Sequence, residues 1–299
     1  MADRAEISPG DWWRTSIIDI EPGKINVRGY PIQDLIGRVD FVSMIWLYLT
    51  GELLTPGRRK LLEGTLAGSM DHGPHAPSIA AARMAVSCGL PLNSAVATGA
   101  GMLGDIHGGA GQQCMAFLYR LGEMVDERAD DADPVISAVR DYMKTESPFI
   151  PGFGHRFHPV DPRVPRLYEL MDEAKAEGAI DGRYADLARR VEDALAEIKG
   201  KRLPMNIDGV SAAVFCEFGL APELGRGLFV LARSVGVLAH AYEQGGQGHR
   251  IKGPMPRHIP YTYEGPAERR LPDAETGTGP GSTKSGSTKS GSTKSGTDV

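Results

Sequence analysis

Cysteine is scarce in this sequence, because its 299 residues include only Cys88, Cys114 and Cys216. An odd number of widely separated cysteines does not form the framework of a disulfide-stabilised secreted domain, and the spacing is not that of a metal site. Each cysteine lies in an apolar or small-residue stretch. We therefore expect buried free thiols in a reducing cytoplasm.

Long hydrophobic runs and an excess of positive charge are also missing. No apolar run approaches the roughly 20 residues that span a bilayer, and the first residues, MADRAEISPGDWWRTS, lack the basic and apolar segments of a secretory signal. The net charge of −5 disfavours binding to nucleic acid or to an anionic membrane. We expect a cytoplasmic protein with neither kind of partner.

The motifs of several enzyme classes do not occur. The sequence contains no Gly-x-x-x-x-Gly-Lys-Ser/Thr phosphate loop, no strand-linked Gly-x-Gly-x-x-Gly and no Gly-x-Ser-x-Gly elbow. His-Glu-x-x-His spacing is absent too, which disfavours a zinc hydrolase, and we expect no bound metal.

Helical patterning is what the sequence does contain. A strand pair, Thr15–Ile20 and Lys24–Arg28, flanks the turn Glu21-Pro22-Gly23 near the N-terminus. Apolar patterns of helical length then follow at Phe41–Thr50, Arg58–Ser69, Ala76–Ser87, Asn93–Leu103, Gln112–Val125, Asp133–Lys144, Val164–Glu177, Arg183–Ile198 and Leu224–Gln244. We predict an all-α fold with a small N-terminal β-hairpin.

The C-terminal end differs from the rest in composition. The repeat GSTKS occurs three times in tandem after Thr276, with no aromatic or aliphatic residue before Val299. Such a segment cannot bury enough surface to offset the entropy cost of ordering it. We predict a catalytic body over residues 1–275, with a smaller helical subdomain around 115–205, and a disordered tail over 276–299.

Residues 151–163 form the segment richest in reactive side chains, Pro-Gly-Phe-Gly-His-Arg-Phe-His-Pro-Val-Asp-Pro-Arg. Its glycines and prolines predict a tight loop whose backbone can approach a ligand closely. His155 can exchange a proton near neutral pH. Arg156 and Arg163 carry planar forks that suit phosphate or carboxylate, so the loop indicates catalysis on an anionic substrate.

Two further histidines lie at predicted helix boundaries. His72 lies in Met-Asp-His-Gly-Pro-His, residues 70–75, where a solvated turn is the default interpretation. His107 precedes two glycines and a predicted helix, whose N-terminus favours the neutral imidazole. A neutral imidazole can donate a hydrogen bond to a carbonyl, while a capping or buried structural histidine is the alternative.

A carboxylate and a buried arginine complete the set. Asp208 precedes the apolar stretch Val210–Leu220, either as a plain N-cap or as a base at the entrance of a buried helix. Arg233 lies within an apolar helix and must meet a carboxylate of the core or of a ligand. Arg250 and Arg257 follow in a Gly/Pro-rich segment. This inventory suits acid–base chemistry alpha to a carbonyl, on a substrate with more than one carboxylate.

Five ordered motifs carry a resemblance to the citrate synthase superfamily over roughly residues 15–264. They are the Arg-Gly-Tyr-Pro-Ile segment within 23–35, His-Gly-Gly-Ala at 107–110, Gly-Phe-Gly-His-Arg with the later Asp-Pro-Arg at 152–163, Asn-Ile-Asp-Gly at 206–209 and Ala-Arg-Ser-Val-Gly-Val-Leu-Ala-His at 232–240. The Asp-His-Gly-Pro at 71–74 and the short body resemble the citryl-CoA lyase module of ATP-citrate lyase, whereas His107 is retained as in the synthases.

The resemblance implies roles for individual residues. Asp208 would exchange the methyl proton of acetyl-CoA, and neutral His107 would hydrogen-bond the thioester oxygen as an enol forms. His155 would act on the oxaloacetate carbonyl, or on the tertiary hydroxyl of citryl-CoA in reverse. The residues implied to hold the substrate carboxylates are His72, Arg163, Arg233 and Arg257, with Arg250 as an alternative to Arg257. Those implied to face coenzyme A are Ile150, Pro151, Gly152, Phe153, Gly154 and Arg156.

The implied activity is carbon–carbon bond cleavage or formation on an acyl-CoA. Citryl-CoA lyase, which yields acetyl-CoA and oxaloacetate, is the leading hypothesis; citrate synthase and 2-methylcitrate synthase are alternatives, and a non-catalytic paralogue that binds a CoA ester is an alternative of another class. The CoA thioester is a substrate, and no permanently bound cofactor is expected. The family resemblance also implies a homodimer or higher homo-oligomer. The small-residue segments Ala80–Ala82 and Ala95–Gly104 suit either that interface or ordinary packing within the chain.

Overall fold

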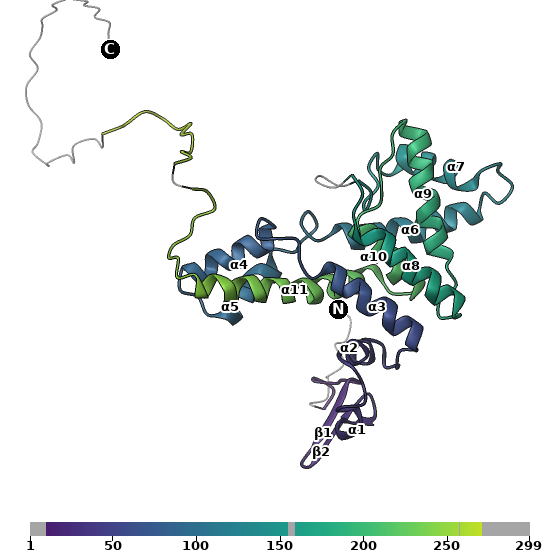
Figure 1. Cartoon of the computed structure of the whole chain (residues 1–299), viewed down its shortest axis with the longest axis horizontal. Coiled ribbons are helices and arrows are strands. Elements are labelled where there is room, and N and C mark those ends of the chain that lie inside the picture. Colours follow the sequence, from purple (N-terminus) through teal and green to yellow (C-terminus); the bar gives the residue numbers. More distant parts are fainter. Residues whose placement is uncertain (1–9, 155–158, 257, 271–299) are drawn as a thin grey trace, which may run out of the picture. The chain divides into compact units, whose positions relative to one another are not determined.

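The computed structural model describes residues 10–154, 159–256 and 258–270 of the chain (Figure 1). The chain divides into two compact units, Met1–Pro254 and Met255–Val299. All helices and strands found in the described residues belong to the first unit. The boundary expected at residue 275 lies outside the described residues, and the subdomain expected around 115–205 stays a prediction.

A small antiparallel sheet begins the first unit, in the order β1 (Ile18–Glu21), β2 (Lys24–Val27) and β3 (Tyr30–Pro31). Glu21 pairs with Lys24, and Gly23 has a φ of 80° in the turn between them, a conformation that glycine adopts without strain. The predicted hairpin is confirmed, and the short strand β3 extends it.

Eleven helices follow in the part of the chain that the structure describes, so the predicted all-α class is confirmed. Their bounds are α1 (Ile32–Leu35), α2 (Phe41–Thr50), α3 (Pro56–Ser69), α4 (Pro77–Ser87), α5 (Leu92–Gly101), α6 (Ala110–Asp126), α7 (Pro134–Thr145), α8 (Arg163–Ala176), α9 (Arg183–Lys199), α10 (Ile207–Glu217) and α11 (Pro222–Gly246). Prolines at the first position of α3, α4, α7 and α11 lack an N–H that would have no partner inside the helix, which favours these starts.

The main core surrounds α10, which packs against α3, α6, α8 and α9. Its residues from Gly209 to Cys216 are all buried, as expected for a helix that is apolar on every side. Cys114 and Cys216 are buried free thiols, as predicted. Cys88 is exposed, so that expectation is wrong for it; it is the C-cap of α4, in the turn toward α5.

Helices α4, α5 and α11 pack against one another as a second group (Figure 1). A Cβ atom on Gly99 of α5 would lie 2.6 Å from Val237 Cγ1 of α11 and 2.8 Å from the carbonyl oxygen of Ser78 in α4. This small residue therefore serves close packing within the chain. By length and composition α11 is also apolar enough to cross a membrane; we assign it to the helical core because it packs against α3, α4, α5 and α6. The predicted cytoplasmic location stays a prediction.

Candidate active site

A cavity of about 130 Å³ brings together residues from five parts of the first unit: the α3–α4 loop, the segment before α6, the start of α8, the start of α10 and the middle of α11. It is lined by His72, His107, Gly108, Arg163, Asn206, Ile207, Asp208, Phe229 and Arg233. Five residues that the sequence singled out, His72, His107, Arg163, Asp208 and Arg233, are thus neighbours around one hollow.

Asp208 lies in the first turn of α10, where the helix dipole favours a negative charge. The N-cap of this helix is Asn206, whose Oδ1 accepts hydrogen bonds from the backbone N–H groups of Asp208 at 3.0 Å and Gly209 at 3.2 Å. The interpretation of Asp208 as a plain N-cap is therefore wrong, because the cap of α10 is Asn206.

The loop before the undescribed residues 155–158 is fastened to the start of α10. Asn206 donates its side-chain N–H to the carbonyl of Gly154 at 2.8 Å and its backbone N–H to that of Gly152 at 3.0 Å, while Gly154 N–H donates to Pro204 at 2.7 Å. A Cβ atom on Gly209 would lie 2.4 Å from the carbonyl oxygen of Gly152, so this contact requires glycine. The loop expected to face coenzyme A is thus held directly against the carboxylate-bearing helix.

The proton on His107 can be assigned from its partners. Its Nε2 lies 3.2 Å from the backbone nitrogen of Ser78, which can only donate, and 3.0 Å from the Ser78 hydroxyl. Nε2 is therefore the acceptor, and the proton of the neutral ring is on Nδ1. Burial lowers the pKa of His107, and the positive charge of Arg233 lowers it further, so the neutral form is favoured. The helix N-terminus that meets this histidine is that of α4, not that of α6 as the sequence suggested.

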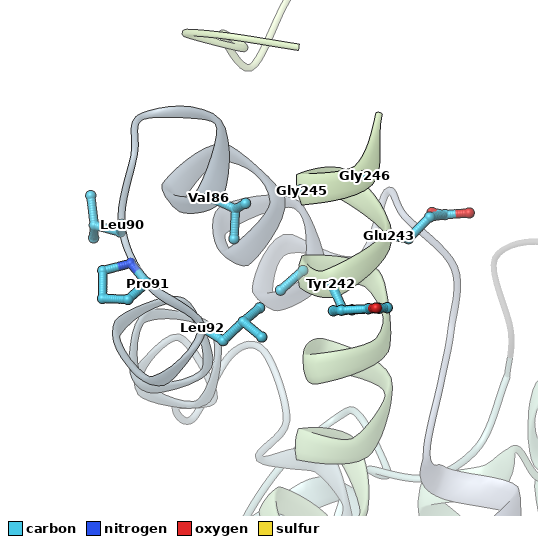
Figure 2. Close-up of a pocket in the computed structure, with 9 residues that line it drawn as sticks. Val86, Leu90, Pro91, Leu92, Tyr242, Glu243, Gly245 and Gly246 are labelled. Atoms are coloured by element: carbon cyan, nitrogen blue, oxygen red, sulfur yellow. The ribbon is translucent and has the colours of Figure 1, made fainter. Parts of the chain in front are cut away.

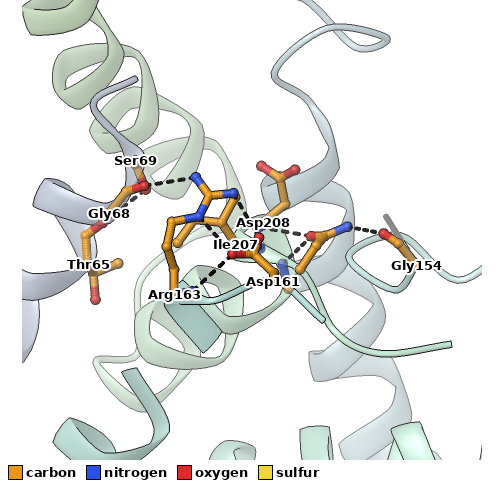
Figure 3. Close-up of polar contacts among 10 residues, drawn as sticks. Thr65, Gly68, Ser69, Gly154, Asp161, Arg163, Ile207 and Asp208 are labelled. Carbon is orange, nitrogen blue, oxygen red and sulfur yellow. Dashed lines mark hydrogen bonds and ion pairs between the residues drawn. The ribbon is translucent and has the colours of Figure 1, made fainter. Parts of the chain in front are cut away.

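Arg163 is held by a bidentate pair with Asp161 (Figure 3). Its Nε and Nη2 lie 2.9 and 2.7 Å from the two carboxylate oxygens, and its Nη1 donates to the carbonyl of Gly68 at 3.0 Å. Asp161 is fully buried and also accepts from the backbone N–H of Ile207 at 3.1 Å. Burial by itself would raise the pKa of Asp161, but the hydrogen bonds from Arg163 outweigh it and lower the pKa, so the pair is ionic. The N–H groups that remain on Nη1 and Nη2 are suited to a ligand carboxylate.

Arg233 is 4% exposed in the middle of α11. Its Nε donates to the carbonyl of Ser69 at 3.0 Å, and its guanidinium carbon lies 4.9 Å from the centroid of the Phe229 ring. Burial lowers the pKa of Arg233, whereas the carboxylates of Asp208 and Asp71 raise it. The cavity therefore has a buried cation on the wall formed by α11, across from the start of α10.

The family of the chain follows from a comparison with protein-family models. The model described as "Citrate synthase, C-terminal domain" matches residues 54–255. The chain belongs to the citrate synthase family. Its predicted superfamily and fold are thereby confirmed.

Individual members of the citrate synthase family give a finer comparison. The structure of citryl-CoA lyase from Hydrogenobacter thermophilus is 34% identical with a TM-score of 0.77, covering 87% of this chain and 98% of that one. Citrate synthase 2 of Bacillus subtilis is 31% identical over 225 residues, 75% of this chain and 55% of the relative. A ternary complex of Thermoplasma acidophilum citrate synthase with carboxymethyl coenzyme A and oxaloacetate is 25% identical with a TM-score of 0.61, covering 79% of this chain and 60% of that one. The chain spans about half the length of the curated relatives it matches.

Three of the residues predicted from the citrate synthase resemblance, His155, Arg156 and Arg257, lie outside the described residues. Among the loop residues expected to face coenzyme A, Ile150 is buried in the main core and Phe153 packs partly against it. Phe153 also forms an isolated antiparallel bridge with Met205. The roles of all the predicted site residues stay predictions.

Sequence reasoning missed three residues that build this citrate synthase-type site: Asp161, Asn206 and Ser78. Asp161 was visible in the motif Asp-Pro-Arg, and its spacing of two from Arg163 could have suggested the ion pair. Asn206 is a residue type that caps helices and stands two positions before Asp208. Ser78 carries no sequence signal, because its contact with His107 joins residues 29 positions apart.

A larger groove of about 420 Å³ lies between the α4–α5 turn and the end of α11 (Figure 2). Its lining is Val86, Leu90, Pro91, Leu92, Ala241, Tyr242, Glu243, Gly245 and Gly246. The one charged residue in this lining is the acid Glu243, so the groove does not suit an anionic ligand. In the described ranges, no group of three or more His, Cys, Asp or Glu gathers as a metal site; the expected absence of a metal stays a prediction.

Proposed function

We propose that this protein cleaves citryl-CoA reversibly into acetyl-CoA and oxaloacetate. In the direction of cleavage, His155 accepts the proton of the tertiary hydroxyl as its oxygen becomes the carbonyl of oxaloacetate, the adjacent carbon–carbon bond breaks, and the electron pair of that bond forms the enolate of acetyl-CoA. Asp208, which is protonated at the start of this direction, then delivers its proton to the enolate carbon, which becomes the methyl group. In the reverse direction Asp208 acts as the base on that methyl group.

The observation that carries the proposal is the hydrogen bonding of His107. The backbone N–H of Ser78 occupies Nε2, so Nδ1–H is the group that can donate to a thioester oxygen. The lowered pKa keeps the imidazole neutral. A neutral donor that hydrogen-bonds to an oxygen that gains charge stabilises an enolate without giving up its proton.

The cations of the site suit the other half of the substrate. Arg163 and Arg233 come from different helices and line the same cavity with His72. Oxaloacetate carries two carboxylates, each of which can accept from a guanidinium fork. Under this proposal the CoA portion contacts Arg156 and the loop Ile150–Gly154.

The lyase is favoured over the synthase because the citryl-CoA lyase structure has the higher TM-score, 0.77 against 0.61, and the higher identity, 34% against 25%. Citrate synthase is the second candidate, since the Bacillus subtilis enzyme is 31% identical. Both reactions share the enol step, and they differ in whether the citryl-CoA thioester is hydrolysed.

One experiment with two substrates separates these activities. The protein is incubated with citryl-CoA while oxaloacetate is measured, and with acetyl-CoA and oxaloacetate while free thiol is measured. Oxaloacetate without free thiol supports the lyase, and free thiol in the second incubation supports a synthase. Propionyl-CoA in place of acetyl-CoA tests the 2-methylcitrate reaction. A well-folded protein that does neither would overturn the proposal in favour of a non-catalytic CoA-ester-binding paralogue.

We further propose that the protein acts as a homodimer or higher homo-oligomer. Helix α11 leaves several apolar side chains exposed to solvent, namely Leu231, Val235, Leu238 and Tyr242. Contiguous exposed apolar surface of this kind is typical of subunit contacts. Light scattering of the active protein tests this, and an active monomer would contradict it.

A further inference from the structure

Helix α11 holds the segment before His72 at three successive turns of one face. Arg233 donates to the carbonyl of Ser69, and His240 Nε2 lies 3.1 Å from Asp71 Oδ2. Between them, a Cβ atom on Gly236 would lie 2.2 Å from the carbonyl oxygen of Met70, so the segment lies directly against the helix there. Positions 233, 236 and 240 share a helix face because they are three and four residues apart.

The partners of His240 fix its tautomer. Its Nδ1 lies 3.2 Å from Nη1 of Arg83 in α4, and a guanidinium can only donate. Nδ1 is therefore the acceptor, so Nε2 carries the proton and donates it to Asp71 Oδ2. Arg83 is 8% exposed and is itself held by Glu243 at 2.7 Å and Gln247 at 3.1 Å. Hydrogen bonds thus run from a buried arginine through His240 to one oxygen of Asp71.

The other oxygen of Asp71 shapes the backbone that carries His72. Asp71 Oδ1 accepts from the backbone N–H of His72 at 2.7 Å and of Gly73 at 3.0 Å. Gly73 has a φ of 83°, so the chain turns sharply just after His72. Rotation of the Asp71 carboxylate would therefore move the backbone of a residue whose side chain lines the cavity.

We propose that Asp71 and His240 are positioning residues that hold His72 in place for the dicarboxylate substrate. This inference rests on the proposed function, since it takes oxaloacetate as the ligand of His72. Neither residue belongs to the cavity lining, so their effect reaches the ligand through His72. Small displacements of a binding group are costly, so the loss should appear in oxaloacetate affinity and leave the CoA ester unaffected.

The test is calorimetric titration of the wild-type protein and its variants with oxaloacetate alone, together with KM for the CoA ester and melting temperature. His240→Leu should weaken the Kd of oxaloacetate about tenfold, with the KM of the CoA ester changed less than about twofold. His240→Gln should stay within about threefold of the wild type, because its amide N–H can replace Nε2–H as donor to Asp71. His75→Leu is the matched control, since His75 is an exposed histidine of the same loop, and it should bind as the wild type does.

A second variant covers the case in which His240→Leu does not fold. Asp71→Asn keeps an acceptor for the two backbone N–H groups but turns an amide N–H toward Nε2–H of His240. It should weaken oxaloacetate binding about tenfold, and the double variant should be no weaker than either single one. Unchanged oxaloacetate affinity in folded His240→Leu or Asp71→Asn would overturn the inference, as would additive losses in the double variant. A wild-type protein that binds no oxaloacetate would instead overturn the proposed function.

Discussion

The two walls of the cavity are built by different means. The α10 wall, which carries Asp208, is held mainly through contacts to backbone groups: the Asn206 side chain bonds to backbone atoms of Gly154, Asp208 and Gly209, the Asn206 N–H donates to the Gly152 carbonyl, and Gly209 lies against Gly152 with no room for a Cβ atom. The α11 wall is held mainly by side chains, through Arg233, His240 and Arg83, with one close backbone approach at Gly236.

The difference matters for what each wall would do. Under the proposed function the α10 wall carries the base Asp208 and the CoA loop, where proton transfer requires placement within hydrogen-bond reach. The α11 wall carries the groups that bind carboxylates. Side-chain networks can be altered by one substitution at a time, so the α11 wall is where binding affinity can change without loss of the base. Arg163 and its partner Asp161 link α10 to the end of α3, because Asp161 accepts from Ile207 and Arg163 donates to the carbonyl of Gly68. Arg233 of α11 donates to the next carbonyl of α3, that of Ser69.

The largest effect is expected from the chemistry of the α10 wall. Asp208→Asn removes the base but keeps the shape, so turnover should fall about 10²–10⁴-fold. Because Asn206 is the cap, melting temperature should fall by no more than about 2–4 °C, from the loss of a charge that the helix dipole favours, and oxaloacetate binding should survive with Arg163 and Arg233 in place. Turnover in the active direction, calorimetry and thermal melting measure these three quantities.

Asp133→Asn is the matched control for this prediction. Asp133 does cap its helix, α7, by accepting from the backbone N–H of Ile136, and asparagine caps about as well as aspartate. Turnover should stay as in the wild type, and unfolding free energy should fall by at most about 1 kcal/mol, because Asp133 also pairs with the half-exposed Arg190 at 2.6 Å. Near-normal turnover in folded Asp208→Asn would remove Asp208 from the mechanism.

A single methyl group should disrupt the backbone packing of the same wall. In Gly209→Ala the new Cβ would meet the Gly152 carbonyl oxygen at 2.4 Å and Met205 Cγ at 2.7 Å, so the loop must move. We expect a loss of about 1–3 kcal/mol in unfolding free energy and a turnover about 10- to 100-fold lower. Denaturant unfolding and steady-state kinetics measure both.

Gly227→Ala tests whether this loss comes from the close approach. Gly227 lies within α11 and a Cβ atom there meets nothing within 4 Å. Alanine is the better helix former by about 0.5–1 kcal/mol, so this variant should be as stable as the wild type or more so. If Gly209→Ala left stability and turnover unchanged in the same way, the α10 wall would tolerate substitution as well as the α11 wall does.

How far the sequence predicts these walls depends on the range of the contacts. The helices other than α1 and α10 could be predicted from apolar spacing, and local family motifs identified five site residues, because both are local properties of the chain. These site residues are Arg163, Asp208, His107, His72 and Arg233. The residues that hold these side chains in place could not be predicted from the sequence. Ser78 contacts His107, and Arg83 contacts His240, only after α4 packs against its neighbours. The sequence left open whether Asp208 caps α10, because Asn206 and Asp208 are both good caps and only the backbone geometry distinguishes them.

A dependence on pH is expected from the histidine between the walls. The pKa of His107 in the folded protein is lowered, first by burial and then by the charge of Arg233. As pH falls, His107 therefore takes up a proton in the unfolded chain at a higher pH than in the folded protein. Stability should therefore decrease as pH falls through the ordinary histidine range, and the neutral, active form should persist below that range. Melting temperature from about pH 7.5 to 5 should fall less steeply in His107→Gln than in the wild type. The control His75→Gln should follow the wild-type curve, and an identical slope in all three proteins would contradict the assignment.

The smallest effect is expected away from both walls, at the N-terminus of α9. Its N-cap is Gly182, which has no side chain, and Glu217 at the end of α10 takes over the capping. The Glu217 carboxylate accepts from the backbone N–H groups of Gly182 at 2.9 Å, Tyr184 at 2.6 Å and Ala185 at 3.0 Å. Glu217→Gln removes the charge and one acceptor, so we expect a loss of about 1 kcal/mol in unfolding free energy. The melting temperature should fall by about 2–4 °C, with turnover and oxaloacetate affinity unchanged.

Glu223→Gln is the control for this prediction. Glu223 is an exposed acid in the first turn of α11, and its substitution should change the unfolding free energy by less than about 0.5 kcal/mol. A fall in turnover for Glu217→Gln would mean that the two ends of α10 are coupled, and that the α10 wall depends on packing well beyond the cavity.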